Sequence, residues 1–445
     1  MLYSHTVWYA GSMLASYDTH TSLTPLRRDM LRILEAGYKA ITIETLMPTR
    51  FRVSGDMLII RDVASVTRMS LKGVRHIYIA GFGKGSATAC VYIATQLKNR
   101  LTEGVVIDAL QEKKYHVRSD SRMRVFWGTH PLPSRQNVMA TKHMVRMVRS
   151  ATKDDMVIYF VGGGGSSLLC GSMEEMKRGR FSFDALTKHG AAIEELNVVR
   201  KHMSSVKGGW LAAYAAPARQ VSLVVSDVCG NDMATIASGP TMYDMTTVTD
   251  ASTLLKKYGV PACPLAETPK DKELFVRSSY HMLACNEDAV LAMIKKARAL
   301  GYAASVGSLA LSGEAYKALW PLAQKVHNRE AIICAGETTV TIHGTGRGGR
   351  NQEAVLGVVA AMQKDTQQYK GVCAASVASD GYDNTNVAGA IADSDMAHAA
   401  LSAGLDAEVF LKNNNSYSFF KKTGGHVIAQ KKCFNVSDVM VVIRK

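Results

Sequence analysis

The chain has 445 residues, of which 47% are hydrophobic and 20% are charged, a composition typical of a globular protein with two or three domains. No apolar run approaches the roughly 18 residues that a membrane-spanning helix needs. The net charge of +15 favours anionic partners, but Lys and Arg are spread along the chain without the clustering of a nucleic-acid-binding face.

The first glycine-rich break follows a predicted strand at residues 77–80. It reads GFGKGS at 81–86, and a predicted helix of small and apolar residues continues to 97. The break is not a Walker A loop, because the G-x-x-x-x-G-K-[ST] spacing is absent. Lys84 therefore stands between glycines at a strand-to-helix turn. It is either a phosphate contact or a solvated turn lysine.

The second break is the stretch VIYFVGGGGSSLL at 157–169, where a strand buried on both faces ends in four glycines. Glycines followed by a helix start present bare backbone N–H groups, which bind anions. A tight turn that only needs positive φ is the alternative. The candidate phosphate-binding residues are Gly163, Gly164, Gly165, Ser166 and Ser167.

Polar side chains follow in the next two segments. Arg200 and Lys207 lie in a predicted helical region at 184–220 and form either a carboxylate or phosphate site or a solvated helix face. Asp227 and Asp232 follow a β-branched strand, and such carboxylates suit a hydrated Mg²⁺ carried by nucleotide phosphates. Helix capping is the alternative for Asp232. His130, in a Pro-fixed loop, is expected to be held by its neighbours.

We expect a domain boundary near residue 270. After it, strand and helix patterns alternate at 281–284, 289–300, 302–306 and 313–327, which predicts the start of a second parallel sheet. Gly344, Gly346 and Gly349 match G-x-G-x-x-G, a weak signal alone. Arg347 and Arg350 bring paired guanidinium groups to this loop, which suits phosphoryl stabilisation better than dinucleotide binding.

A predicted strand at 372–380 ends at Asp380, and Asp383 follows in the next turn; the two acids either bind Mg²⁺ or a hydroxyl, or form an ordinary turn. In open α/β sheets, ligands gather at the carboxyl ends of strands. The breaks share that position, so we expect a phosphoryl-transfer site in a cleft between two domains. They lie at 81–86, 162–167, 226–232, 344–350 and 380–385.

Several long motifs in this order resemble the glycerate 2-kinase family, whose C-terminal part is called the MOFRL domain. The resemblance runs from about residue 26 to 443. It rests on GFGKGSATA (81–89), HPLP (130–133), GGGGSSLL (162–169), NVVRKHMSSVKGG (197–209), SDVCGND with IASGPT (226–241), GETTVTIHGTGRGGRNQE (336–353) and SDGYDNTNVAGA (379–390).

The resemblance implies ATP-dependent phosphorylation of D-glycerate to 2-phosphoglycerate with Mg²⁺. It also implies an α/β fold with two mainly parallel sheets, in a Rossmann-like domain (1–270) and a smaller MOFRL-type domain (271–445), and a site in the cleft between them. Lys84 and Arg350 match motif residues that would stabilise charge on the transferred phosphoryl group. Metal or substrate candidates complete the set: Asp227 and Asp232 for the metal, and Arg200, Lys207, Arg347 and Asp380 for the substrate.

The chain departs from the family pattern at 430–435, where QKKCFN replaces a Thr-Gly-Pro-Thr-rich loop. This departure motivates one alternative, a degenerate homologue that binds nucleotide without turnover. An NAD(P)H-dependent hydroxypyruvate reductase using Gly344, Gly346 and Gly349 is the other. We expect small-molecule partners only, neither nucleic acid nor membrane, and a monomer or homodimer. With no Lys or Arg in the first 22 residues and dispersed, reduced cysteines, we expect a cytoplasmic location, or else a mitochondrial one.

Overall fold

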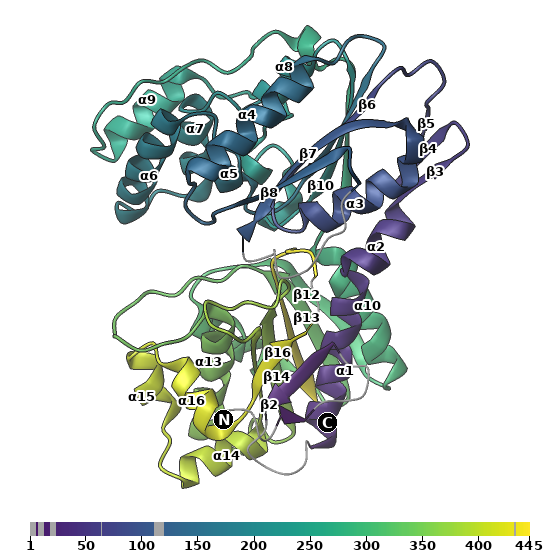
Figure 1. Ribbon diagram of the computed structural model, residues 1–445. Coiled ribbons are helices and arrows are strands. Elements are labelled where there is room, and N and C mark those ends of the chain that lie inside the picture. The colour runs from purple at the N-terminus through teal and green to yellow at the C-terminus, as the bar shows by residue number, and fades with distance from the viewer. Residues whose placement is uncertain (1–5, 8–12, 18–23, 64, 111–119, 431–432) are drawn as a thin grey trace. The chain divides into compact units, whose positions relative to one another are not determined.

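The computed structural model describes residues 6–7, 13–17, 24–63, 65–110, 120–430 and 433–445 (Figure 1). Two compact units make up the chain. The N-terminal unit comprises Leu46–Asp227 and Asn231–Ala284, and the C-terminal unit comprises Met1–Thr45, Val228–Gly230 and Cys285–Lys445. None of the helices in the described ranges is long and apolar enough to cross a membrane.

A six-stranded sheet forms the centre of the N-terminal unit, in the order β11-β10-β9-β6-β7-β8. All five pairings are parallel, which confirms the predicted Rossmann-like sheet. Every residue of β6 and β9 is buried, as expected for strands covered on both faces. The strands are β6 (Ile77–Phe82), β7 (Leu101–Ala109), β8 (Met123–Gly128), β9 (Met156–Val161), β10 (Arg219–Val225) and β11 (Ser278–Ala284).

Helices cover both faces of this sheet. The connection β6-α3-β7 moves along the sheet in one direction and β8-α4-β9 returns in the other, so right-handed crossovers place α3 and α4 on opposite faces. The same unit contains a three-stranded antiparallel sheet in the order β3-β4-β5. The elements are β3 (Phe51–Ser54), β4 (Met57–Arg61), β5 (Val66–Ser70), α2 (Ile43–Arg50), α3 (Ser86–Leu97), α4 (Arg135–Arg149), α5 (Gly165–Leu168), α6 (Met173–Lys188), α7 (Ile193–His202), α8 (Trp210–Ala215) and α9 (Val248–Lys257).

Within the described residues, an eight-stranded sheet forms the centre of the C-terminal unit, in the order β1-β2-β16-β15-β14-β17-β13-β12. Only the β12–β13 pairing is parallel; the six others are antiparallel. The prediction of a mainly parallel second sheet is therefore wrong. The last strand of the chain inserts between β13 and β14 and runs against both. The strands are β1 (Thr6–Val7), β2 (Leu14–Tyr17), β12 (Ala303–Leu311), β13 (Glu330–Gly336), β14 (Val372–Ala378), β15 (Gly389–Asp393), β16 (His426–Ala429) and β17 (Asp438–Arg444).

Figure 1 shows α13 on one side of this sheet and α1 with α10 on the other. All of α13 from residue 351 to 360 is buried, so this helix lies at the centre of its layer and packs against α11, α14, α15 and α16. The helices are α1 (Pro25–Ala40), α10 (Asn286–Ala299), α11 (Ala315–Ala318), α12 (Trp320–Lys325), α13 (Arg350–Lys364), α14 (Ser394–Ser402), α15 (Ala407–Lys412) and α16 (Ser416–Thr423).

The two units divide the chain differently from the predicted domains 1–270 and 271–445. Helix α1 packs on α10, and a Cβ on Gly37 would lie only 2.7 Å from the sulfur of Met293, so the first 45 residues belong to the C-terminal unit. The strand predicted at 281–284 to begin the second sheet is instead the end of β11, which pairs with β10 in the first sheet.

Candidate functional site

Two glycine-rich loops meet at the carboxyl edge of the six-stranded sheet. Lys84 donates a backbone hydrogen bond to the carbonyl oxygen of Gly163 (2.8 Å), and Gly162 donates to that of Phe82 (2.9 Å). Gly83 adopts φ +112, and a Cβ there would lie 2.4 Å from the Gly162 carbonyl oxygen. Only glycine fits this approach. The two loops singled out from the sequence are therefore one packed assembly, with Lys84 half-buried within it.

Asp227 and His130 lie against the same loop. A Cβ on Gly163 would lie 2.3 Å from Asp227 Oδ2, and one on Gly164 would lie 2.9 Å from His130 Nε2. The bare backbone therefore lets a carboxylate and an imidazole approach the glycines. No backbone carbonyl of the described residues accepts a hydrogen bond from the N–H of Gly163 or Gly164, so both N–H groups are candidate donors for an anion.

The serines after the glycines differ in their surroundings. Helix α5 has only four residues, so the loop amides rather than a helix dipole are the relevant donors. Ser166 Oγ lies 2.9 Å from Ser238 Oγ, which donates to Asn197 Oδ1 at 2.9 Å. Ser166 is thus held in place from α7. Ser167 is half-buried, and its carbonyl oxygen accepts from Asn137 Nδ2 at 3.2 Å.

Two other predicted residues, Lys207 and Arg200, are engaged in local contacts. Lys207 is 5% exposed; its ammonium pairs with Glu175 at 2.6 Å and donates to the carbonyl oxygen of Leu169. The Arg200 guanidinium lies over the Phe183 ring, 4.6 Å from its centroid, and burial lowers its pKa. We therefore leave both out of the proposed site.

Asp232 also has a local role. Its side chain accepts from the backbone N–H of Ala234 (3.0 Å) and closes a turn; the next short helix begins at Ile236 with Thr235 at its N-cap, so Asp232 is not a helix cap. A metal site of three or more His, Cys, Asp or Glu side chains does not occur within the described ranges. Mg²⁺ bound with phosphate needs only one or two carboxylates, and Asp227, beside the loop amides, fits that need better than the exposed Asp232.

Asp108 is a site-forming residue that the sequence reasoning missed. Its buried carboxylate at the end of β7 accepts from the backbone N–H groups of Gly85 (3.1 Å) and Ala87 (2.9 Å). It therefore fixes the start of α3 and, with it, the loop that carries Lys84. A single acid at the end of the apolar run VVID was the available signal.

In the C-terminal unit, Arg350 is the first residue of α13 and is held by two acids. Its Nε lies 2.5 Å from Asp438 Oδ2, its Nη2 3.1 Å from Oδ1, and its Nη1 2.8 Å from Glu337 Oε1. Burial lowers the pKa of Arg350, but the two carboxylates outweigh this and raise it. Arg350 is therefore a permanent cation in a fixed orientation.

Asp380 and Asp383 follow β14 but differ in burial. Asp383 is 3% exposed and accepts from the backbone N–H groups of Asn351 (3.1 Å) and Gln352 (3.0 Å) and from both side-chain amides. It caps α13, which leaves no place for a ligand. Asp380 is half-buried, and its Oδ1 accepts from the backbone N–H of Tyr382 at 3.1 Å.

The G-x-G-x-x-G match serves packing within the C-terminal unit. Cβ atoms on Gly344 and Gly346 would each lie 2.3 Å from atoms of Asn413, and one on Gly349 would lie 2.2 Å from the carbonyl oxygen of Asp383. The glycines are thus required by neighbouring backbone, which disfavours a dinucleotide loop. Arg347 is exposed, with its guanidinium 4.5 Å from the centroid of the Tyr417 ring.

Comparisons with known proteins agree with the sequence motifs. A family model described as a domain of unknown function (DUF4147) matches residues 29–267, and the MOFRL family model matches 330–438. The chain is 34% identical to the D-glycerate 2-kinase of Thermotoga maritima, over 78% of this chain and 85% of that protein. It is 31% identical to an Agrobacterium vitis protein provisionally named hydroxypyruvate reductase, over 82% and 86%.

A solved structure gives the same relationship. The crystal structure of a glycerate kinase from Thermotoga maritima matches with a TM-score of 0.79 and 28% identity, covering 94% of this chain and 99% of that one. Fold, motif order and sequence identity therefore agree over most of the chain. The protein belongs to the glycerate kinase family that joins a DUF4147 domain to a MOFRL domain.

Proposed function

We propose that the protein is a glycerate 2-kinase, which transfers the γ-phosphoryl group of ATP to the 2-hydroxyl of D-glycerate and forms ADP and 2-phospho-D-glycerate. Family membership supports the reaction. The main structural support for the proposed reaction is that Lys84, the tetraglycine loop and Asp227 meet at one edge of the six-stranded sheet. Amide donors, a cation and a carboxylate are what polyphosphate transfer requires.

Each group has a distinct role in this proposal. The N–H groups of Gly163 and Gly164 bind phosphate oxygens, and Lys84 stabilises the charge that develops on the transferred group. Asp227 would hold Mg²⁺, which when bound neutralises phosphate charge. Ser166 positions the loop through Ser238.

Arg350 is the second cation that we propose for catalysis. Asp438 and Glu337 fix the direction of its guanidinium, so no side-chain ordering is needed when an anion binds. Arg347 and Asp380, more accessible than their neighbours Gly349 and Asp383, are proposed to contact the carboxylate and a hydroxyl of glycerate.

The test is to incubate the purified protein with MgATP and D-glycerate, measure ADP, and identify the phosphoglycerate isomer by ³¹P NMR. Glycerate-dependent ADP with the 2-phospho isomer supports the proposal. NADPH oxidation by hydroxypyruvate without ADP formation would support the reductase instead, and nucleotide binding without turnover would support the degenerate homologue. A sample without D-glycerate controls for ATP hydrolysis.

Location and assembly stay predictions. We expect a monomer or homodimer in the cytoplasm, with mitochondria as the alternative. Analytical ultracentrifugation and cell fractionation would test them.

A further inference from the structure

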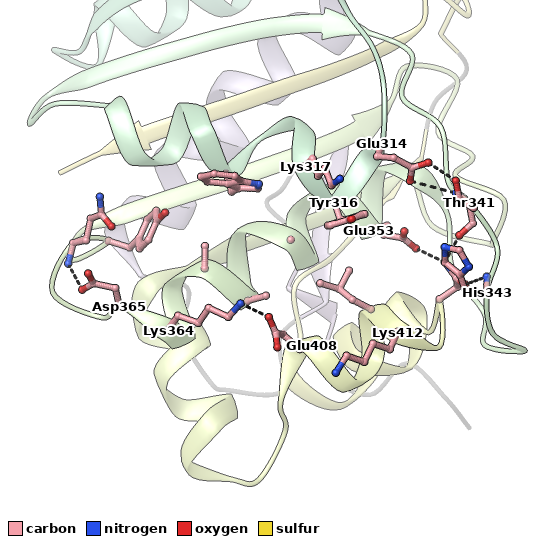
Figure 2. A pocket seen from close by; sticks show the side chains of 18 residues that line it. Glu314, Tyr316, Lys317, Thr341, His343, Glu353, Lys364, Asp365, Glu408 and Lys412 are labelled. Atoms are coloured by element: carbon pink, nitrogen blue, oxygen red, sulfur yellow. Dashed lines mark hydrogen bonds and ion pairs between the residues drawn. The ribbon is translucent and has the colours of Figure 1, made fainter.

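A cavity of about 650 Å³ opens in the C-terminal unit between α11, α12, α13 and α15 (Figure 2). This volume lies within the range of small-molecule sites. Its walls are more apolar than polar, with Tyr316, Trp320, Tyr369 and Leu411 among them. Thr341, His343 and Glu353 in its lining belong to the 336–353 motif, but none of the residues proposed for catalysis or for phosphate, metal or substrate binding lines it. The proposed function therefore assigns no role to the cavity.

One face of α13 forms the floor of the cavity. Glu353, Gly357, Ala360, Ala361 and Lys364 line it, and residues three or four apart share a helix face. The middle of that face carries only glycine and alanine. A Cβ on Gly357 would lie 2.0 Å from the carbonyl oxygen of Tyr316, so α11 approaches closely there. The small side chains beyond it leave the space open.

Glu353 provides the polar end of the cavity. It is 4% exposed. Within the described part of the chain, its carboxylate receives one hydrogen bond, from Asn414 Nδ2 at 3.4 Å, and no cation pairs with it. Burial, together with the charges of Glu314 and Asp383, raises the pKa of Glu353 to about 7. A buried carboxyl with so little compensation is costly for the protein alone.

The charges around the cavity are arranged asymmetrically. Figure 2 shows Glu314 and Glu353 on one side, near Thr341 and His343, where the Glu314 carboxylate accepts from the Thr341 hydroxyl. On the other side, Lys364 pairs with Glu408, near Lys412. The first side therefore holds two carboxylates together with Lys317, whose ammonium lies over the Tyr316 ring, 5.3 Å from its centroid. On the second side, Glu408 already pairs with a cation.

We propose that this cavity binds a small molecule with a flat apolar body and one protonated amine. The amine lies against the carboxylates of Glu353 and Glu314, and the flat body lies on the glycine and alanine floor beside Trp320. Aromatic rings beside a carboxylate stabilise an ammonium group both by charge and by cation–π attraction. An anionic or neutral ligand of the same shape finds no such complement at Glu353.

Three probes of matched shape test the proposal by isothermal titration calorimetry on the full chain: 2-phenylethylamine, 2-phenylethanol and 3-phenylpropionate. We expect the amine to bind about 10-fold or more tightly than the other two, because it adds a charge-assisted contact. Glu353→Gln, which keeps the shape and can still accept from Asn414, should remove that preference. Glu408→Gln, at the other end, is the matched control and should leave it.

A third variant tests binding in the cavity without changing a charged side chain. Ala361→Phe fills the cavity and should abolish amine binding, while urea unfolding checks that all three variants remain folded. Equal binding of all three probes, an unchanged preference in Glu353→Gln, or no amine binding up to about 10 mM, a limit near −3 kcal/mol of affinity, would overturn the proposal.

Discussion

Gly163→Ala tests the contact between the tetraglycine loop and Asp227. A Cβ at this position would lie 2.3 Å from Asp227 Oδ2 and 2.8 Å from its carboxyl carbon, whereas such contacts rarely fall below about 3.2 Å, so atoms must move by roughly 1 Å. The φ of Gly163 lies outside the left-handed region, so alanine adds no backbone strain. Overpacking of this kind costs about 1–3 kcal/mol, and a 1 Å misplacement about 10²-fold in rate.

Steady-state kinetics with MgATP and D-glycerate, together with urea unfolding, measure both effects. We expect kcat/KM to fall about 100-fold. Gly179→Ala is the control, because Gly179 lies in α6 with no atom within 4 Å of the added Cβ; it should retain activity and gain up to about 1 kcal/mol.

A second comparison isolates the clash itself. In an Asp227→Ala background the carboxylate is gone, so Gly163→Ala should cost much less stability than in the wild type. An equal loss in both backgrounds, or wild-type turnover by Gly163→Ala, would refute the assignment of Asp227 and the loop to one site.

Three further predictions follow from the same geometry. Lys84→Ala should lower kcat by at least about 100-fold; near-normal turnover would reject its role. Asp438→Asn leaves Arg350 without its bidentate partner and should cost about 2–4 kcal/mol of stability by urea unfolding; a loss below 1 kcal/mol would mean that the pair is dispensable. Glu353 has a pKa of about 7 instead of 4.5, so its contribution should lower stability as pH rises from 4.5 to 7, by up to about 3 kcal/mol. Glu353→Gln should therefore lose less stability over that range, and parallel pH profiles would contradict this.

The pattern of residues along the chain predicted the two glycine-rich loops of the N-terminal unit. Apolar strands that break into glycines predicted the loops at 81–86 and 162–167; the second begins where β9 ends, whereas β6 continues through Phe82, so the first begins two residues later than predicted. Parallel strands with alternating helices then bring both loops to one edge. The position of these loops could be predicted because strand ends, glycine-rich breaks and helix starts are each set by residues close together in the sequence.

The C-terminal sheet could not be predicted in the same way. The run at β17 (Asp438–Arg444) is apolar enough for either a parallel or an antiparallel strand, and only its insertion between β13 and β14 decides the direction. Likewise, nothing in the pattern of α1 indicates that Gly37 packs on Met293. Pairing partners far along the chain are set by tertiary packing, which periodicity does not record.

The aspartates show where reasoning from residue type alone fails. Asp108 and Asp383 are almost completely buried, at 0% and 3% exposure. Each carboxylate accepts hydrogen bonds from backbone N–H groups at the start of a helix that follows a glycine-rich loop. Asp227 and Asp380 are half-buried at comparable strand ends. A capping carboxylate must be enclosed by the helix start, whereas a ligand-binding one must keep an open face. Burial therefore separates two kinds of acid: it assigns Asp108 and Asp383 to building the loops, and it keeps the half-buried Asp227 and Asp380 as candidates for the proposed metal and substrate contacts.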